Sequence, residues 1–291
     1  MGAAAALPQP LDARSRSVRE PGLSGRDYLP VVVPSGFKLE HRIVDGVKIF
    51  HLRAGEVEHQ FAPGLKARCW GYNGTVNGPV IEVVEGDRVR IYVTNELPAP
   101  TTVHWHGFIL PNGMDGVSGV TQERIPPGET WVYEFELVQS GTFMFHSLHD
   151  TMTQEGMGLT GQFIIHPQSS PTPQVDRDFA LLLHEWKIDA GARRPDPNEM
   201  SDFNVLTING KVFPFLDVLV VRTGQRVRMR IGNLSAMDHY TIHLHGYEFL
   251  VTAVDGHRIP EAQQRRRVTT LVGVGETRDI EFDAIYPGDW V

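Results

Sequence analysis

The sequence has 291 residues, enough for about two domains that each bury a core. Its formal net charge of −8 gives no reason to expect a nucleic-acid partner. We find no apolar run of about 18 or more residues, so no membrane span is expected. The single cysteine, Cys69, excludes an intramolecular disulfide and any cysteine-rich zinc or iron–sulfur site.

The predicted elements are short strands separated by turns. Residues 1–36 are rich in Ala, Pro, Arg and Ser without a clear period, which predicts a flexible N-terminal arm. From residue 37 strand-like stretches follow one another; Val89, Ile91 and Val93, for example, alternate with more polar residues. No long amphipathic helix is found, and 29 glycines and 20 prolines lie among the apolar runs. The prediction is an all-β fold of antiparallel barrels or sandwiches.

A Pro- and Ser-rich linker at 168–176 divides the chain into a first domain, 37–167, and a second, 177–291. The two domains repeat one another. Residues 84–95 match 222–233 at a spacing of 138, and residues 128–141 match 275–288 at a spacing of 147. Self-similarity at this distance indicates a duplicated domain rather than a short-repeat solenoid.

Each copy carries a His-x-His pair, His104-Trp105-His106 in the first and His243-Leu244-His245 in the second. Side chains alternate along a strand, so each pair points two imidazoles the same way, about 7 Å apart. Neutral imidazole is the commonest metal ligand in proteins. One such pair is as readily explained by a half-buried strand with hydrogen-bonded histidines. Two pairs at matching places in a repeat predict metal sites.

With His146 and His149 added, these motifs resemble the multicopper oxidases, most closely the two-domain, laccase-like group built from cupredoxin domains. The resemblance covers nearly all of residues 40–291. It implies two cupredoxin-like Greek-key β-barrel or sandwich domains and an oxidoreductase that takes electrons from phenol-type or metal-ion donors and reduces dioxygen to water. It also implies a homotrimer in which neighbouring subunits share a copper cluster. The predicted ligands are His104 and His243 for type 2 copper and His106, His146 and His245 for the type 3 pair.

The resemblance gives Asp115 a role in moving protons beside the cluster, and a carboxylate near bound metal suits that role. An Asp that caps a turn before Gly116 is an equally good explanation of this residue.

Two departures from the family pattern affect the predicted copper sites. The usual His-Ser-His is replaced by His146-Ser147-Leu148-His149. His149 supplies the missing ligand only if the strand bulges or ends at Ser147; otherwise it faces away. The usual type 1 copper histidine is replaced by Tyr240, and the place for the type 1 cysteine falls beyond Val291. We therefore expect type 2 and type 3 copper without a type 1 site, in a second domain that is incomplete at its C-terminus.

Two other functions remain open. The first is a non-catalytic, copper-binding cupredoxin-like protein. The second is a copper nitrite reductase, which needs a cysteine beside a ligand histidine, whereas His146 lies between Phe145 and Ser147. The apolar start at residues 1–7 is too short for a complete secretory signal, so we expect an exported protein whose signal peptide is absent or removed.

Overall fold

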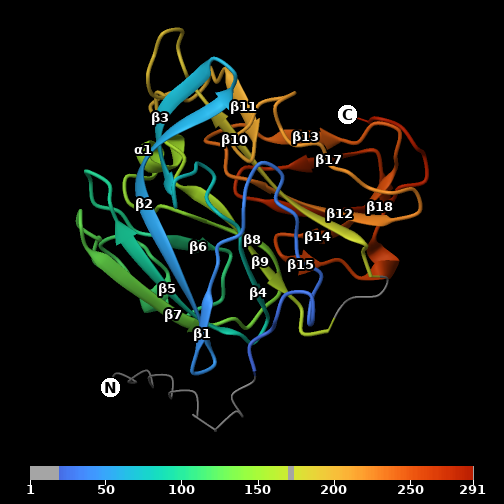
Figure 1. The fold of residues 1–291 in the computed structure, drawn as a ribbon, viewed down its shortest axis with the longest axis horizontal. Helices are drawn as coiled ribbons and strands as arrows, with labels where there is room; N and C mark the ends of the chain where they lie inside the picture. The colour runs from blue at the N-terminus through green and yellow to red at the C-terminus, as the bar shows by residue number, and fades with distance from the viewer. Residues whose placement is uncertain (1–19, 170–173, 291) are drawn as a thin grey trace, which may run out of the picture.

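The computed structural model describes residues 20–169 and 174–290, and this part of the chain is all-β, as predicted. Figure 1 shows the predicted first domain, here called domain 1, in blue to green on the left and the predicted second domain, domain 2, in yellow to red on the right. The helical elements are α1 (Thr151–Gly156) and the 3-10 turns η1 (Asn112–Met114) and η2 (Glu261–Gln263). Residues 170–173 of the predicted linker and residues 1–19 of the predicted arm lie outside the described residues.

Domain 1 is formed by two sheets that pack face to face. The first has the order β1–β2–β5–β7, with β3 paired to β2, and the second has the order β4–β9–β8–β6. The strands are β1 (Arg42–Val44), β2 (Val47–Ala62), β3 (Leu65–Tyr72), β4 (Ile81–Val84), β5 (Arg88–Asn95), β6 (His104–His106), β7 (Thr130–Glu136), β8 (Gly141–His146) and β9 (Thr160–His166). The β2–β5 and β4–β9 pairs are parallel, and the other strand pairs of domain 1 are antiparallel, as predicted. Long connections between these strands permit the parallel pairing.

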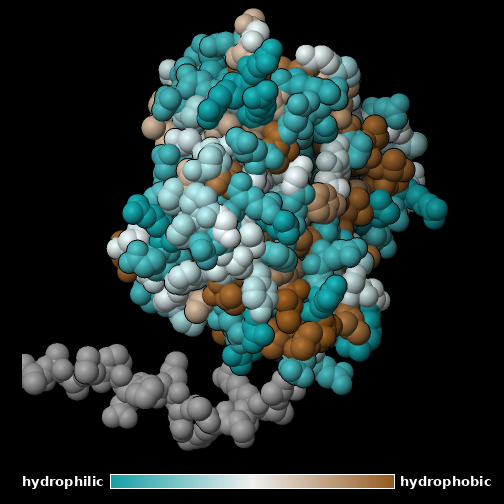
Figure 2. Space-filling view, turned by 60° about the vertical axis from the view of Figure 1, so that its left-hand side comes forward, coloured by the Kyte–Doolittle hydropathy of each residue, from teal (hydrophilic) through white to brown (hydrophobic). Residues whose placement is uncertain are grey.

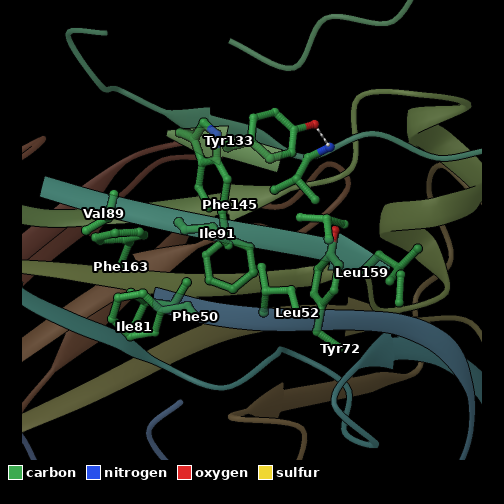
Figure 3. Close-up of a cluster of buried hydrophobic side chains, with 14 of the residues drawn as sticks. Phe50, Leu52, Tyr72, Ile81, Val89, Ile91, Tyr133, Phe145, Leu159 and Phe163 are labelled. Carbon is green, nitrogen blue, oxygen red and sulfur yellow. Dashed lines mark hydrogen bonds between the residues drawn. The ribbon is translucent and has the colours of Figure 1, made fainter. Parts of the chain in front are cut away.

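The core of domain 1 lies between these sheets. Figure 3 shows Phe50 and Ile91 of the first sheet meeting Phe145 and Phe163 of the second. Tyr133 on β7 accepts a hydrogen bond from the Val103 N–H at 3.1 Å, drawn as the dashed line in Figure 3. This bond fixes the backbone just before β6, the strand that carries the first His-x-His pair.

Domain 2 has a counterpart of the first sheet of domain 1, whereas its counterpart of the second sheet has fewer strands. Its larger sheet has the order β11–β10–β12–β18–β14–β15, with β16 paired to β14, and β13 pairs with β17 in a separate sheet. The strands are β10 (Arg177–Trp186), β11 (Val205–Ile208), β12 (Arg226–Asn233), β13 (Tyr240–His243), β14 (Phe249–Val254), β15 (His257–Arg258), β16 (Arg266–Arg267), β17 (Thr269–Val272) and β18 (Thr277–Asp283). Within the described residues, β13 has no neighbour that corresponds to β8 beside β6.

Residues 22–36, predicted to belong to a flexible arm, instead form an extended strap in contact with both domains. Val32 accepts a hydrogen bond from Ala180 N–H and donates one to Asp178 O, both in domain 2. The Val31 N–H donates to the buried Glu82 carboxylate of domain 1 at 2.7 Å. The structure differs from the prediction because these contacts are single backbone pairs, which leave no hydrophobic period in the sequence.

A buried group of charges joins the domains behind β8. Arg230 on β12 is 3% exposed and contacts the carboxylates of Asp178 and Asp279 at 2.9 Å and 3.3 Å. Thr142 on β8 accepts a hydrogen bond from Arg230 and donates one to Asp279 at 2.6 Å. Burial alone would raise the pKa of Asp178, but the charges of Arg230 and Arg228 outweigh it and lower that pKa. The strand that ends at His146 is therefore anchored to domain 2.

The face seen in Figure 2 is mainly hydrophilic, with hydrophobic patches near its lower and right-hand edges. Among the described residues, no helix has the length and apolar character needed to cross a bilayer.

Candidate metal centre

Alternation along β6 decides which way its histidines point. Trp105 is fully buried in the core of domain 1, where its ring meets the edge of the Tyr133 ring at a centroid distance of 5.2 Å. His104 and His106, one residue to either side, are half-buried on the opposite face. A large core residue between two histidines therefore holds both imidazoles on one side of the sheet.

The neighbouring strand β8 brings a third imidazole to the same place. β6 and β8 pair antiparallel with His104 directly opposite His146. Each of His104, His106 and His146 offers a ring nitrogen, and these atoms lie within 4.8 Å of one another. His106 Nδ1 and His146 Nε2 are 3.2 Å apart. This is the only group of three or more potential ligand side chains found among the described residues.

In two of these rings, Nδ1 forms a hydrogen bond with a backbone carbonyl oxygen. His104 Nδ1 lies 2.7 Å from Asp115 O, and His146 Nδ1 lies 3.0 Å from Ser147 O. A ring that donates its Nδ1–H to a carbonyl presents an unprotonated Nε2 to a metal ion. Imidazole nitrogens arranged this way suit copper, and also zinc, iron and nickel.

Gly116 allows the Asp115 carbonyl to reach His104. Its φ is +82°, and a Cβ at this position would lie 1.8 Å from the carbonyl oxygen of Val103. Only glycine tolerates both the left-handed backbone and this close approach. The Asp115 carboxylate lies farther away, with Oδ1 at 3.5 Å from His104 Nδ1. The closest contact of Asp115 with the site is thus through its backbone.

The pKa values of His106 and His146 are shifted in opposite directions. Burial lowers the pKa of His106, and the charges of His146 and His104 lower it further. Burial alone would also lower the pKa of His146, but the carboxylate of Glu155 outweighs it and raises that pKa. Glu155 Oε1 lies 2.7 Å from His146 Nδ1. Glu155 was missed from the sequence because nothing in its position on the short helix α1 indicates that it reaches β8.

Comparison with known proteins decides the family. Two family models described as multicopper oxidase match residues 53–170 and 189–291. The solved structure of multicopper oxidase mgLAC is 32% identical, with 83% of this chain and 77% of that chain covered and a TM-score of 0.75. This chain belongs to the multicopper oxidase family. The family predicted from the histidine motifs is thereby confirmed, and copper is the metal that it implies.

Other relatives of this chain are a blue copper oxidase and a copper resistance protein. The blue copper oxidase from Nitrosomonas europaea is 29% identical, with 83% of this chain and 77% of that chain covered and a TM-score of 0.76. Copper resistance protein A from Pseudomonas syringae pv. tomato is 27% identical over 281 residues, covering 79% of this chain and 45% of the relative. The chain thus spans about half the length of the curated relatives it matches.

His149 lies apart from the three-histidine group. β8 ends at His146, and in the loop that follows His149 Nδ1 lies 3.0 Å from the Ser118 hydroxyl. The group of three does not include His149. Its role as a replacement ligand stays a prediction.

The second His-x-His pair is exposed on domain 2. The rings of His243 and His245 lie 4.9 Å apart, and His243 Nδ1 lies 2.5 Å from Val268 O. Neither ring joins the group on β6 and β8. The bond to Val268 repeats the arrangement at His104, in which a carbonyl holds Nδ1 and leaves Nε2 free.

Tyr240, at the place of the usual type 1 histidine, has a structural partner. Its hydroxyl donates to Glu185 Oε2 at 3.0 Å, and the other oxygen of Glu185 accepts the Met237 and Asp238 N–H groups. Cys69 lies buried in domain 1, where burial raises the pKa of its thiol to about 12. This buried thiol is not part of the three-histidine group.

Proposed function

We propose that this chain acts as a copper-dependent oxidoreductase that takes electrons from phenol-type or metal-ion donors and reduces dioxygen to water. The observation that carries the proposal is the convergence of His104, His106 and His146 on one point. Copper bound there supplies one-electron redox chemistry. The protein supplies the three nitrogens, the carbonyls that orient two of the rings, and the surrounding burial.

We assign His104 to the type 2 copper and His106 and His146 to the type 3 pair. His106 Nδ1 and His146 Nε2 lie 3.2 Å apart, which supports the assignment of these two histidines to one copper pair. Asp115 is proposed to move protons at the site, since its carboxylate is next to the ring of His104. His149 is proposed only as a further ligand after movement of the loop that follows β8.

We propose a homotrimer in which His243 and His245 of one subunit complete the site of the next. Their exposure and their absence from the group on β6 and β8 support a contribution to another copy. Ligands shared between subunits favour the associated state by mass action. Sedimentation velocity should show a larger species with copper than without it; equal distributions would rule out this coupling.

A non-catalytic copper-binding protein is the second candidate. It is favoured by Tyr240 tied to Glu185 and by the burial of Cys69, which support the proposal that a type 1 site is missing. A copper nitrite reductase ranks below it, because neither neighbour of His146 is a cysteine. We also keep export from the cytoplasm as a prediction from the sequence.

Copper titration of wild type and His106→Ala tests the proposed site, with the exposed His257→Ala as a control. Loss of a ligand should weaken binding by more than the roughly 10–100-fold that follows loss of an outer-shell partner. Oxygen uptake with a phenol then separates an oxidase from a binding protein. Equal copper binding by wild type and the His106 variant would contradict the proposed site.

A further inference from the structure

Glu155 is a largely buried carboxylate that faces the side of His146 away from the other two histidines. Its side chain is 18% exposed, and Oε1 lies 2.7 Å from His146 Nδ1. The Nδ1–H is directed at the carbonyl of Ser147, and no aligned donor reaches Glu155 Oε1 from the part of the chain that the structure describes. A buried carboxylate oxygen without a hydrogen bond is costly. Its position therefore needs a compensating positive charge nearby.

Helix α1, which carries Glu155, is held in place by hydrogen bonds of the preceding residue, Gln154. Gln154 is 1% exposed. Its amide oxygen accepts hydrogen bonds from Thr101 and Ser147, and its amide nitrogen donates to Pro100 O at 2.7 Å. These bonds join α1 to the loop before β6 and to the residue just after β8. Glu155 is thus fixed relative to both strands that carry the histidines.

Domain 2 places a neutral ring close to Glu155. His184 on β10 is 1% exposed, and burial lowers its pKa to about 4, although the Glu155 carboxylate acts in the opposite direction. His184 is therefore uncharged near neutral pH and does not neutralise Glu155. The compensating charge has to come through His146.

We propose that Glu155 is a positioning residue for the metal centre, which acts through His146 to favour a cation at its Nε2. A metal ion at Nε2 would place positive charge on the His146 ring, whose Nδ1 lies 2.7 Å from Glu155 Oε1, and the buried carboxylate would then have a cation beside it. Carboxylate, imidazole and metal in a row hold the ring's orientation and raise the basicity of the ligand nitrogen. This inference rests on the proposed copper site.

The test compares wild type, Glu155→Gln and a control, Glu129→Gln, which removes an exposed carboxylate from a turn of the same domain. Glutamine keeps the shape of Glu155 and an acceptor oxygen but removes the charge. We expect Glu155→Gln to bind Cu²⁺ about 10–100-fold more weakly in a chelator competition. The EPR spectrum of its bound copper should also change, whereas Glu129→Gln should match wild type in both measurements.

Thermal unfolding without copper distinguishes positioning from a merely structural role. Glu155→Gln should stay folded in the absence of metal, because the hydrogen bonds of Gln154 that hold α1 are unchanged. Equal affinity and an unchanged EPR spectrum would overturn the role of Glu155 and leave the copper site intact. So would a metal-free variant that is unfolded, because Glu155 would then be needed for the fold rather than for the metal centre. Wild type that binds no copper would overturn the proposed function along with this inference.

Discussion

His184 should make the fold sensitive to mild acid, because the structure buries it in its neutral form. Its Nδ1–H donates to Leu234 O at 2.6 Å, and its Nε2 is buried without a hydrogen-bond partner. Burial lowers the pKa of this imidazole from 6.5 to about 4. In the unfolded chain the same group takes up a proton near its ordinary pKa. Between pH 6.5 and 4 the unfolded state therefore binds more protons than the folded state, and stability falls as the pH is lowered.

The size of the effect follows from the difference between the two pKa values. A shift from 6.5 to about 4 corresponds to about 3 kcal/mol, at roughly 1.4 kcal/mol per pKa unit. The folded protein has its full free energy of unfolding above pH 6.5, and the loss caused by His184 grows as the pH falls toward 4. It is a large share of the stability of a typical domain, which is about 5–15 kcal/mol.

The assay is urea unfolding of metal-free wild type and His184→Asn at pH values across this window and above it. Asparagine can still donate to Leu234 O but does not titrate. The advantage of wild type over the variant should shrink by about 3 kcal/mol between the top and the bottom of the window. Other histidines titrate in both proteins, so their effects cancel in this difference. A difference that stays constant with pH would refute the reasoning.

Four further outcomes are expected. Gly116→Ala should lower the free energy of unfolding by more than about 2 kcal/mol in urea and weaken copper binding, because a Cβ there meets Val103 O at 1.8 Å. Arg230→Ala should cost about 3–5 kcal/mol in the same measurement, since it leaves buried Asp279 without its cation and buried Asp178 with Arg228 alone; a smaller loss would show that water replaces the guanidinium. Asp115→Asn should keep wild-type copper affinity in a chelator competition, because the backbone carbonyl holds His104. Copper-loaded protein should show no intense blue absorption that survives Cys69→Ser, since such a band requires a thiolate ligand and the thiol is buried.

The sequence by itself determined the features that depend on local periodicity. Alternation around Trp105 was enough to place His104 and His106 on one face, because the period of a strand is a property of the backbone alone. The duplication was visible as constant spacings, and the family followed from motifs at matching places.

Only the tertiary structure decided which distant residues meet at the site. The register of β6 with β8 sets His146 opposite His104, and α1 folds back to bring Glu155 against the same ring. The contact of Asp115 with His104 runs through a carbonyl, which a sequence does not distinguish from a carboxylate. Strand order, register and backbone contacts depend on packing between segments far apart in the chain, so they leave no periodic signal in the residues that make them.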